Sequence, residues 1–144
     1  MPVDLLYPTP IFVDRTFDEN IFVEIQNAVD SETYSYNDYW GKTHELSKCG
    51  DILKEYECHH LQTWLEKSLK EYYKSLNQSL LKFNDDFAIE SWIAKFNPDD
   101  YAHIHSHGHV DILGVFYHQT NCIDGELWFE NPTIQSEQSL SYTQ

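Results

Sequence analysis

The sequence predicts an α+β domain in which helices pack on one side of an antiparallel sheet. In residues 18–30 and 51–80 the apolar side chains recur at helical spacing, whereas from Phe87 onward they alternate with a period of two. The 144 residues suffice for one domain with its own core, and an aromatic content of 15% supplies the large side chains for it. We therefore expect a single domain, residues 1–144.

The first half of the chain is expected to be mainly helical. Residues 5–17 combine two prolines with β-formers, which predicts an edge strand at its start. Asp18 is the expected N-cap of a helix over residues 18–30. Residues 31–50 are polar and aromatic without a period, so a loop is expected there. Residues 51–80 carry a near-continuous apolar stripe at helical spacing, which predicts one long helix or two.

The second half is expected to form strands. Alternation of apolar and polar side chains predicts strands over residues 87–98, 111–120 and 125–132. Residues 1–82 would then be helical support, and residues 83–144 would supply the sheet.

The charge of the chain is strongly one-sided. Asp and Glu number 24 and Lys and Arg nine, which gives a formal net charge of −15, and no basic stripe is present. This balance argues against binding to a nucleic-acid backbone. No run approaches the roughly 20 apolar residues of a membrane span, and the N-terminus lacks the pattern of a signal peptide. We therefore expect a cytoplasmic protein with no nucleic-acid partner and no membrane partner.

Between the first two predicted strands lies the run YAHIHSHGHVDILG, residues 101–114, in which four alternate histidines are followed by an aspartate. These residues are His103, His105, His107, His109 and Asp111. In an extended chain they share one face, with neighbours ~7 Å apart. Alternatively, Gly108 permits a reversal that sets the two halves of the run against each other. Both arrangements gather side chains that bind metals, whereas the competing interpretation is a solvated polar loop.

The kinds of ligand in this run point to a particular metal chemistry. The run contains a His-x-His, from His105 to His107, and a His-x-Asp, from His109 to Asp111. Two imidazoles and one carboxylate on one side of an ion leave positions open for substrate and oxygen, as in non-heme Fe(II) oxygenases. An isolated His-x-Asp is a weak signal, but four alternating histidines beside a predicted strand are more specific.

The stretch FNPDDYAHIHSHGHVDILGVFYHQT, followed by DGELWFENP, resembles the core of the Fe(II)/2-oxoglutarate-dependent oxygenase superfamily. Within it, the chain is similar to the prolyl-4-hydroxylase-like proteins of cyanophages and marine bacteria. The likeness covers most of the chain, but only residues 92–132 are specific. It implies a double-stranded β-helix, or jelly roll, with helices on its outer face. It also implies Fe(II) as cofactor, 2-oxoglutarate as co-substrate, and a location that includes the host cytoplasm for a phage-encoded protein.

The resemblance also suggests which residues form the site. His105 and His107 stand at the matching positions, Asp111 is the preferred carboxylate across the Gly108 turn, and His109 is the fourth candidate ligand. Tyr101 and Tyr117 are expected to line the pocket or to hydrogen-bond the co-substrate.

The chain departs from the family pattern in two respects. The superfamily needs a distal histidine as a further iron ligand and then a basic side chain, usually arginine, that pairs with 2-oxoglutarate. This sequence has no histidine after His118 and no lysine or arginine after Lys95. We therefore expect the N-terminal part of an oxygenase domain, inactive by itself, acting on a protein, peptide or small-molecule substrate, with an open sheet edge that permits self-association. The alternatives are a degenerate relic of an oxygenase and a non-catalytic jelly-roll module for metal binding or interaction.

Overall fold

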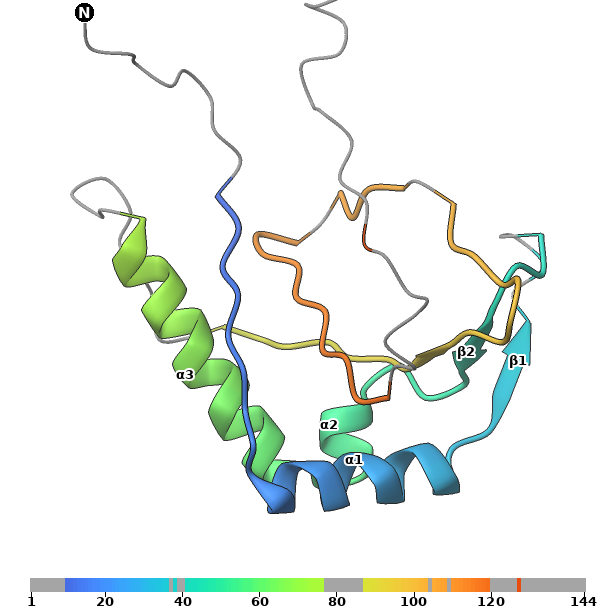
Figure 1. Cartoon of the computed structure of the whole chain (residues 1–144), viewed down its shortest axis with the longest axis horizontal. Coiled ribbons are helices and arrows are strands. Elements are labelled where there is room, and N and C mark those ends of the chain that lie inside the picture. Colours follow the sequence, from blue (N-terminus) through green and yellow to red (C-terminus); the bar gives the residue numbers. More distant parts are fainter. Residues whose placement is uncertain are drawn as a thin grey trace, which may run out of the picture. The chain divides into compact units, whose positions relative to one another are not determined.

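The computed structural model describes residues 10–36, 38, 41–76, 87–103, 105–108, 110–119 and 127. The chain divides into two compact units, Met1–Tyr101 and Ala102–Gln144. The helices and strands of the described residues lie in the first unit (Figure 1): α1 (Glu19–Ser31), β1 (Tyr34–Tyr36), β2 (Glu45–Ser47), α2 (Ile52–Glu55), α3 (His59–Ser75) and β3 (Ala94–Lys95). This combination of helices with an antiparallel sheet confirms the predicted α+β class.

Helix α1 forms where the sequence predicts it. The Asp18 carboxylate accepts a hydrogen bond from the Asn20 backbone N–H at 2.9 Å and so caps the first turn. Ile21, Ile25 and Ala28 follow at the i, i+4 and i+7 positions, and all three are buried. The helix therefore presents one continuous apolar stripe to the core.

The sheet corrects the prediction of a loop over residues 31–50, which was wrong. Strands β1 and β2 both lie inside that range and pair antiparallel, with Tyr34 opposite Ser47. Strand β3 pairs antiparallel with β2, so that Glu45 lies opposite Lys95, and the strand order is β1-β2-β3. Strands of two or three residues are too short to show an alternating pattern, so the apolar side chains of residues 31–50 show no period of two.

Residues 51–80 contain two helices, which confirms the second of the two predicted alternatives. Between α2 and α3 the backbone of Glu57 adopts a left-handed conformation with a φ of 50°. Cys58 follows as the N-cap residue of α3 and is fully buried. The stripe is therefore continuous in sequence but is interrupted in space by a reversal.

The predicted strands agree with the structure less closely than the predicted helices do. In residues 87–98 only β3 forms a strand, although Ser91 also makes a parallel bridge with Asp51. The described residues of the predicted strand 111–120 form no strand, and of 125–132 only residue 127 is described. The order is also different, because β1 and β2 precede α2 and α3. Pairing between distant segments decides where strands form, and alternation alone does not encode it.

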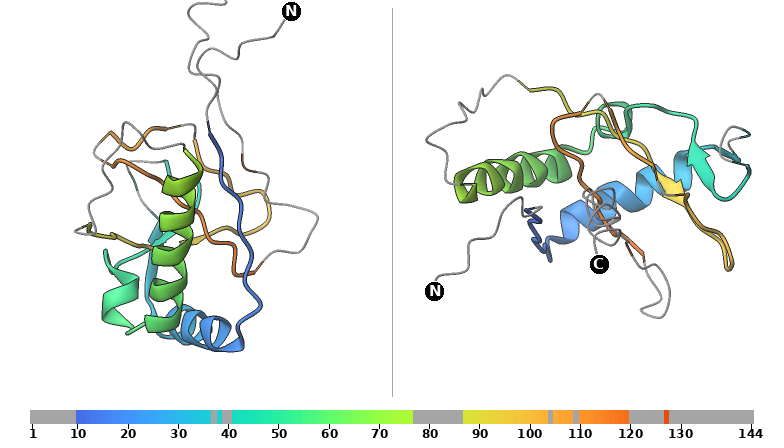
Figure 2. Two further views of the ribbon diagram at one scale, coloured as in Figure 1. Left: turned by 90° about the vertical axis from the view of Figure 1, so that its left-hand side faces the viewer. Right: turned by 90° about the horizontal axis from the view of Figure 1, so that it is seen from above.

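The described part of the predicted edge strand, residues 10–17, is extended but unpaired. It runs beside α3, as the two views in Figure 2 also show. The Tyr72 hydroxyl donates to the Pro10 carbonyl at 3.1 Å, and the Ser68 hydroxyl donates to Asp14 at 2.7 Å. The Phe12 ring lies 5.8 Å from that of Tyr72. Side-chain contacts with α3 therefore take the place of the expected hydrogen bonds to a neighbouring strand.

Every helix in the described residues is too short or too polar to traverse a lipid bilayer.

One carboxylate joins α1 to α3. Glu24 lies in the middle of α1, and its side chain is only 17% exposed. Both of its oxygens lie 3.0 Å from the His60 backbone N–H, and one lies 3.1 Å from the Leu61 backbone N–H. The His60 ring Nδ1 lies 2.5 Å from the same carboxylate. Glu24 therefore caps the first turn of α3 from another helix.

The contact shifts the pKa of both partners. Partial burial would raise the pKa of Glu24, but the hydrogen bonds from His60 and Leu61 outweigh it and lower the pKa below its usual range. The hydrogen bond to the Glu24 carboxylate raises the pKa of His60. Each shift favours the charged form of its group, so the contact stabilises the two groups as an ion pair.

Replacing Glu24 by glutamine should destabilise the protein. The Glu24→Gln side chain keeps one acceptor oxygen and turns an NH₂ group toward N–H donors, so we expect a loss of about 2 kcal/mol in the free energy of unfolding. Urea denaturation followed by circular dichroism measures it. Glu55→Gln, an exposed residue of α2, is the control and should change little. Equal stability of the two variants would contradict the assigned role of Glu24.

The stability that this pair contributes should depend on pH in a defined direction. It is lost at acid pH, as the pH falls through the lowered pKa of Glu24, and at alkaline pH, as the pH rises through the raised pKa of His60. His60→Asn retains an N–H donor near Nδ1 but does not titrate. The stability advantage of the wild type over His60→Asn should therefore shrink as the pH rises from about 6 to about 9. A difference that stays constant over this range would refute the ion pair.

Candidate functional site

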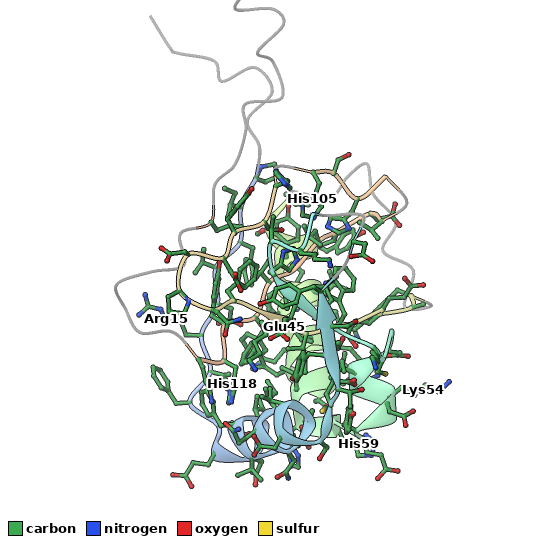
Figure 3. All side chains as sticks on the ribbon, turned by 90° about the vertical axis from the view of Figure 1, so that its right-hand side faces the viewer. Arg15, Glu45, Lys54, His59, His105 and His118 are labelled. Carbon is green, nitrogen blue, oxygen red and sulfur yellow. The ribbon has the colours of Figure 1, made fainter. Side chains whose placement is uncertain are left out.

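The histidine run lies in the second unit, and its described members are His103, His105 and His107. His105, labelled in Figure 3, is exposed, and its Nδ1 lies 2.6 Å from the His103 carbonyl oxygen. A carbonyl only accepts, so Nδ1 carries the hydrogen and donates it. The neutral ring then has its lone pair on Nε2. Metal-bound histidines commonly make this contact, in which one ring nitrogen donates to a carbonyl and the other faces the ion.

His105 and His107 bring these second nitrogens together. Their Nε2 atoms lie 3.1 Å apart, and the ring centroids lie 4.9 Å apart with the planes at 66°. Two nitrogen ligands at right angles, each about 2.1 Å from one ion, are separated by about 3.0 Å. The pair therefore fits two neighbouring ligands of a divalent metal. In the absence of an ion, His107 donates from Nε2 to the Nε2 lone pair of His105.

The other predicted ligands do not complete the set. Asp111 is exposed, and His109 lies outside the described residues. In the described part of the chain, no three His, Cys, Asp or Glu side chains lie close enough together to hold a metal ion. Among the described residues, the predicted ligands that the structure brings together are therefore His105 and His107.

A turn is present at Gly108, where the sequence permits a reversal, but it does not depend on glycine. The backbone of Gly108 is not in the left-handed region, and a Cβ placed on this residue would meet no atom within 4 Å. The described residues on either side of it form no hairpin ladder. A residue other than glycine would fit this position.

The two tyrosines predicted to bind the co-substrate lie in different units. Tyr101 ends the first unit, and Tyr117 belongs to the second. Their side chains are 54% and 49% exposed. Their assignment to a pocket stays a prediction.

Sequence reasoning did not identify His44 as a residue of interest, although the structure buries it to 8% exposure. Its ring stacks on Phe96, with the centroids 4.8 Å apart and the planes at 11°. Its Nδ1 lies 3.1 Å from the Thr43 hydroxyl oxygen and 3.3 Å from the Tyr101 carbonyl oxygen. The contact with the carbonyl is a hydrogen bond when Nδ1 carries the hydrogen, because a carbonyl only accepts. A single histidine in a stretch without a periodic pattern does not indicate from sequence that its ring is buried and makes these contacts.

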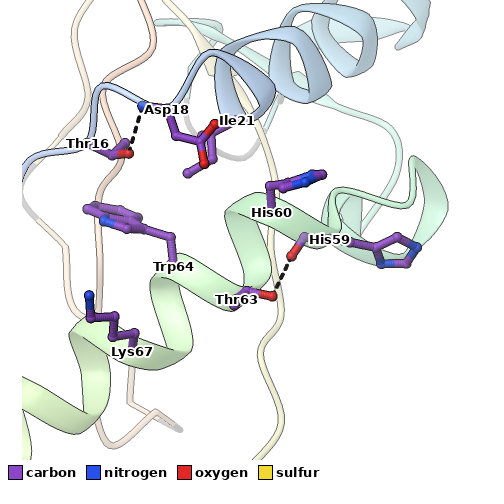
Figure 4. A pocket seen from close by; sticks show the side chains of 8 residues that line it. All are labelled: Thr16, Asp18, Ile21, His59, His60, Thr63, Trp64 and Lys67. Atoms are coloured by element: carbon purple, nitrogen blue, oxygen red, sulfur yellow. Dashed lines mark hydrogen bonds between the residues drawn. The ribbon is translucent and has the colours of Figure 1, made fainter.

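A separate cavity of about 350 Å³ lies in the first unit between the start of α1 and α3 (Figure 4). Trp64 and Ile21 provide its apolar walls, while Thr16, His60 and Lys67 provide polar groups. None of the residues predicted to bind metal or co-substrate is among its described lining residues. The histidine pair therefore stays the candidate site.

No family model, curated protein or solved structure matches this chain. The likeness to the oxygenases thus rests on the motif in residues 92–132.

The geometry predicts the tautomers of the two rings without metal. At a pH where both rings are neutral, His105 should carry its hydrogen on Nδ1 and His107 on Nε2, because of the contacts to His103 and to each other. Adding Zn²⁺, which is diamagnetic, should move the His107 hydrogen from Nε2 to Nδ1, because a ligating nitrogen must be deprotonated while the ring stays neutral. Long-range ¹⁵N–¹H spectra of histidine-labelled protein report both states. A neutral His105 with its hydrogen on Nε2 would exclude the proposed arrangement, and the exposed ring of His59 serves as the reference.

Proposed function

We propose that this chain is the N-terminal part of a non-heme Fe(II)/2-oxoglutarate-dependent dioxygenase of the prolyl-4-hydroxylase-like group, and that its second unit contributes to a jelly-roll core. The observation that carries the proposal is the contact between Nε2 of His105 and Nε2 of His107 at 3.1 Å. The motif in residues 92–132, which contains both histidines, supports the same conclusion.

In the proposed site, His105 and His107 hold the iron through Nε2. The His103 carbonyl fixes the His105 ring by accepting from Nδ1 at 2.6 Å, so the ring does not have to be reoriented when the ion binds. Asp111 is the proposed carboxylate ligand, with His109 as its substitute. Bound iron would supply the chemistry for activating oxygen, with 2-oxoglutarate as co-substrate.

The proposed activity requires groups beyond those in these 144 residues. The distal histidine and the arginine of the family pattern have no counterpart after His118 and Lys95. A bidentate fork for the far carboxylate of 2-oxoglutarate is therefore missing. We propose that the chain binds metal by itself but does not turn over a substrate, which in the active protein would be a protein, a peptide or a small molecule.

One observation favours a second function, a non-catalytic module for metal binding or interaction. All nine basic residues precede Phe96, so the histidine run has no cationic side chain close to it in sequence. A metal-binding module needs no such side chain, whereas binding of 2-oxoglutarate does. A module of this type would also suit self-association through the sheet, whose outer strands β1 and β3 each pair with one strand among the described residues.

Metal titration tests the proposed site. Under anaerobic conditions, His105→Ala and His107→Ala should each weaken Fe(II) affinity at least about tenfold, because each removes a direct ligand. The control His59→Ala removes an exposed histidine of α3 and should leave the affinity unchanged. Isothermal calorimetry measures all four proteins, and equal affinities throughout would rule out the site.

A second measurement separates the enzyme from the module. Decarboxylation of 2-oxoglutarate by the 144-residue chain would show that no further residues are needed. If the chain is inactive, the coding sequence after Gln144 decides the matter. An in-frame histidine followed by an arginine supports the enzyme, and their absence supports the module.

A further inference from the structure

Both main-chain polar groups of Tyr101 are held by two neighbouring residues. The Tyr101 N–H donates to the Thr43 carbonyl at 3.1 Å. The Tyr101 carbonyl accepts from Nδ1 of His44 at 3.3 Å. Thr43 and His44 are both buried and stand directly before β2. Tyr101, which ends the first unit, is thus hydrogen-bonded to the two residues that precede β2.

The chain that leads to Tyr101 is fixed along its length as well. Lys95 belongs to β3 and pairs with β2. The next residue, Phe96, carries the ring on which His44 stacks. The turn that follows is closed twice, because the Asp100 N–H donates to the Asn97 carbonyl at 3.0 Å and the Asn97 N–H donates to the Asp100 carboxylate at 2.8 Å. A defined path therefore connects the sheet with Tyr101.

Tyr101, the last residue of this segment that is hydrogen-bonded to Thr43 and His44, comes shortly before His105 and His107 in sequence. His103, two residues after Tyr101, provides the carbonyl that orients the His105 ring. If Tyr101 were released, the chain between β3 and His105 would sample more conformations, and binding an ion would have to restrict them again. A residue that restrains Tyr101 therefore acts on the metal site through the backbone.

We propose that His44 is a positioning residue for the metal pair. It does not bind the ion, but it restrains Tyr101 and so limits the conformations of the segment that carries His105 and His107. This inference rests on the proposed function, because it assumes that the pair binds a divalent metal.

The side chain of His44 combines two properties that substitution can separate. His44→Phe keeps an aromatic ring against Phe96 but removes the donor to the Tyr101 carbonyl. His44→Asn retains an N–H donor close to the position of Nδ1 but removes the ring. The donor is the group that restrains Tyr101, so the two variants should differ.

The test uses the 144-residue chain, with Ni²⁺ as probe and isothermal calorimetry as the measurement. His44→Phe should weaken the Ni²⁺ affinity about tenfold, the lower end of the range for residues that orient metal ligands. His44→Asn should stay within about threefold of the wild type, because the donor is retained. Hydrogen exchange of the Tyr101 amide provides a readout without metal, and it should be faster in His44→Phe than in His44→Asn.

Two controls keep structural damage apart from positioning. Ile52→Val shortens a buried side chain of α2 and should lower overall stability without changing Ni²⁺ affinity. Phe96→Leu removes the stacked ring at a position that is 50% exposed, so this variant should fold even if His44→Phe does not. It keeps the donor of His44, so exchange at Tyr101 and Ni²⁺ affinity should stay close to those of His44→Asn.

Each outcome decides one of the two proposals. If His105→Ala binds Ni²⁺ as well as the wild type does, the proposed site is wrong, and the role of His44 fails with it. If His105→Ala loses binding while folded His44→Phe or Phe96→Leu releases Tyr101 without loss of affinity, the site stands and the positioning role is wrong. If His44→Asn loses binding as severely as His44→Phe, the donor to the Tyr101 carbonyl is not what supports binding, and the positioning role is again wrong.

Discussion

The Glu24 carboxylate at the N-terminus of α3 is the interaction on which the first unit depends. A helix N-terminus leaves backbone N–H groups without partners, and here α3 has no side-chain cap of its own, because Cys58 makes no capping bond. Glu24 supplies the missing acceptor from α1 and takes the His60 side chain as well. One partly buried carboxylate thus sets both where α3 starts and how it meets α1.

A second carboxylate extends this arrangement to the end of α1. One oxygen of Glu32 accepts from the backbone N–H groups of Thr33 and Lys48, at 2.7 and 3.3 Å. The other accepts from the Tyr56 hydroxyl at 3.0 Å. Burial, followed by this hydrogen bond, raises the pKa of Tyr56 to about 12. A chain with 24 acidic and nine basic residues cannot pair most of its carboxylates with Lys or Arg, and these two accept from backbone amides, a histidine ring and a tyrosine hydroxyl.

The part of the fold that could be predicted is the part that local sequence encodes. The Asp18 cap and the stripe of Ile21, Ile25 and Ala28 lie within one helix, so the sequence predicted α1 closely. The contact between Glu24 and His60 joins residues 36 positions apart and has no sequence signature. Strands β1, β2 and β3 depend in the same way on partners that alternation does not identify.

In the candidate site too, the contacts between residues close in sequence could be predicted and the contact between distant residues could not. His105 and His107 are two residues apart, so their convergence follows from a local pattern, whereas His44 contacts Tyr101 across 57 positions. The net charge of −15 gives the pattern its chemical meaning, because an acidic surface attracts a divalent cation and repels the dianion 2-oxoglutarate. The proposed metal site therefore agrees with the charge of this chain, but the proposed co-substrate does not. In the proposed enzyme, the arginine of the family pattern would have to provide both the fork for the carboxylate and the local positive charge that the region after Lys95 lacks.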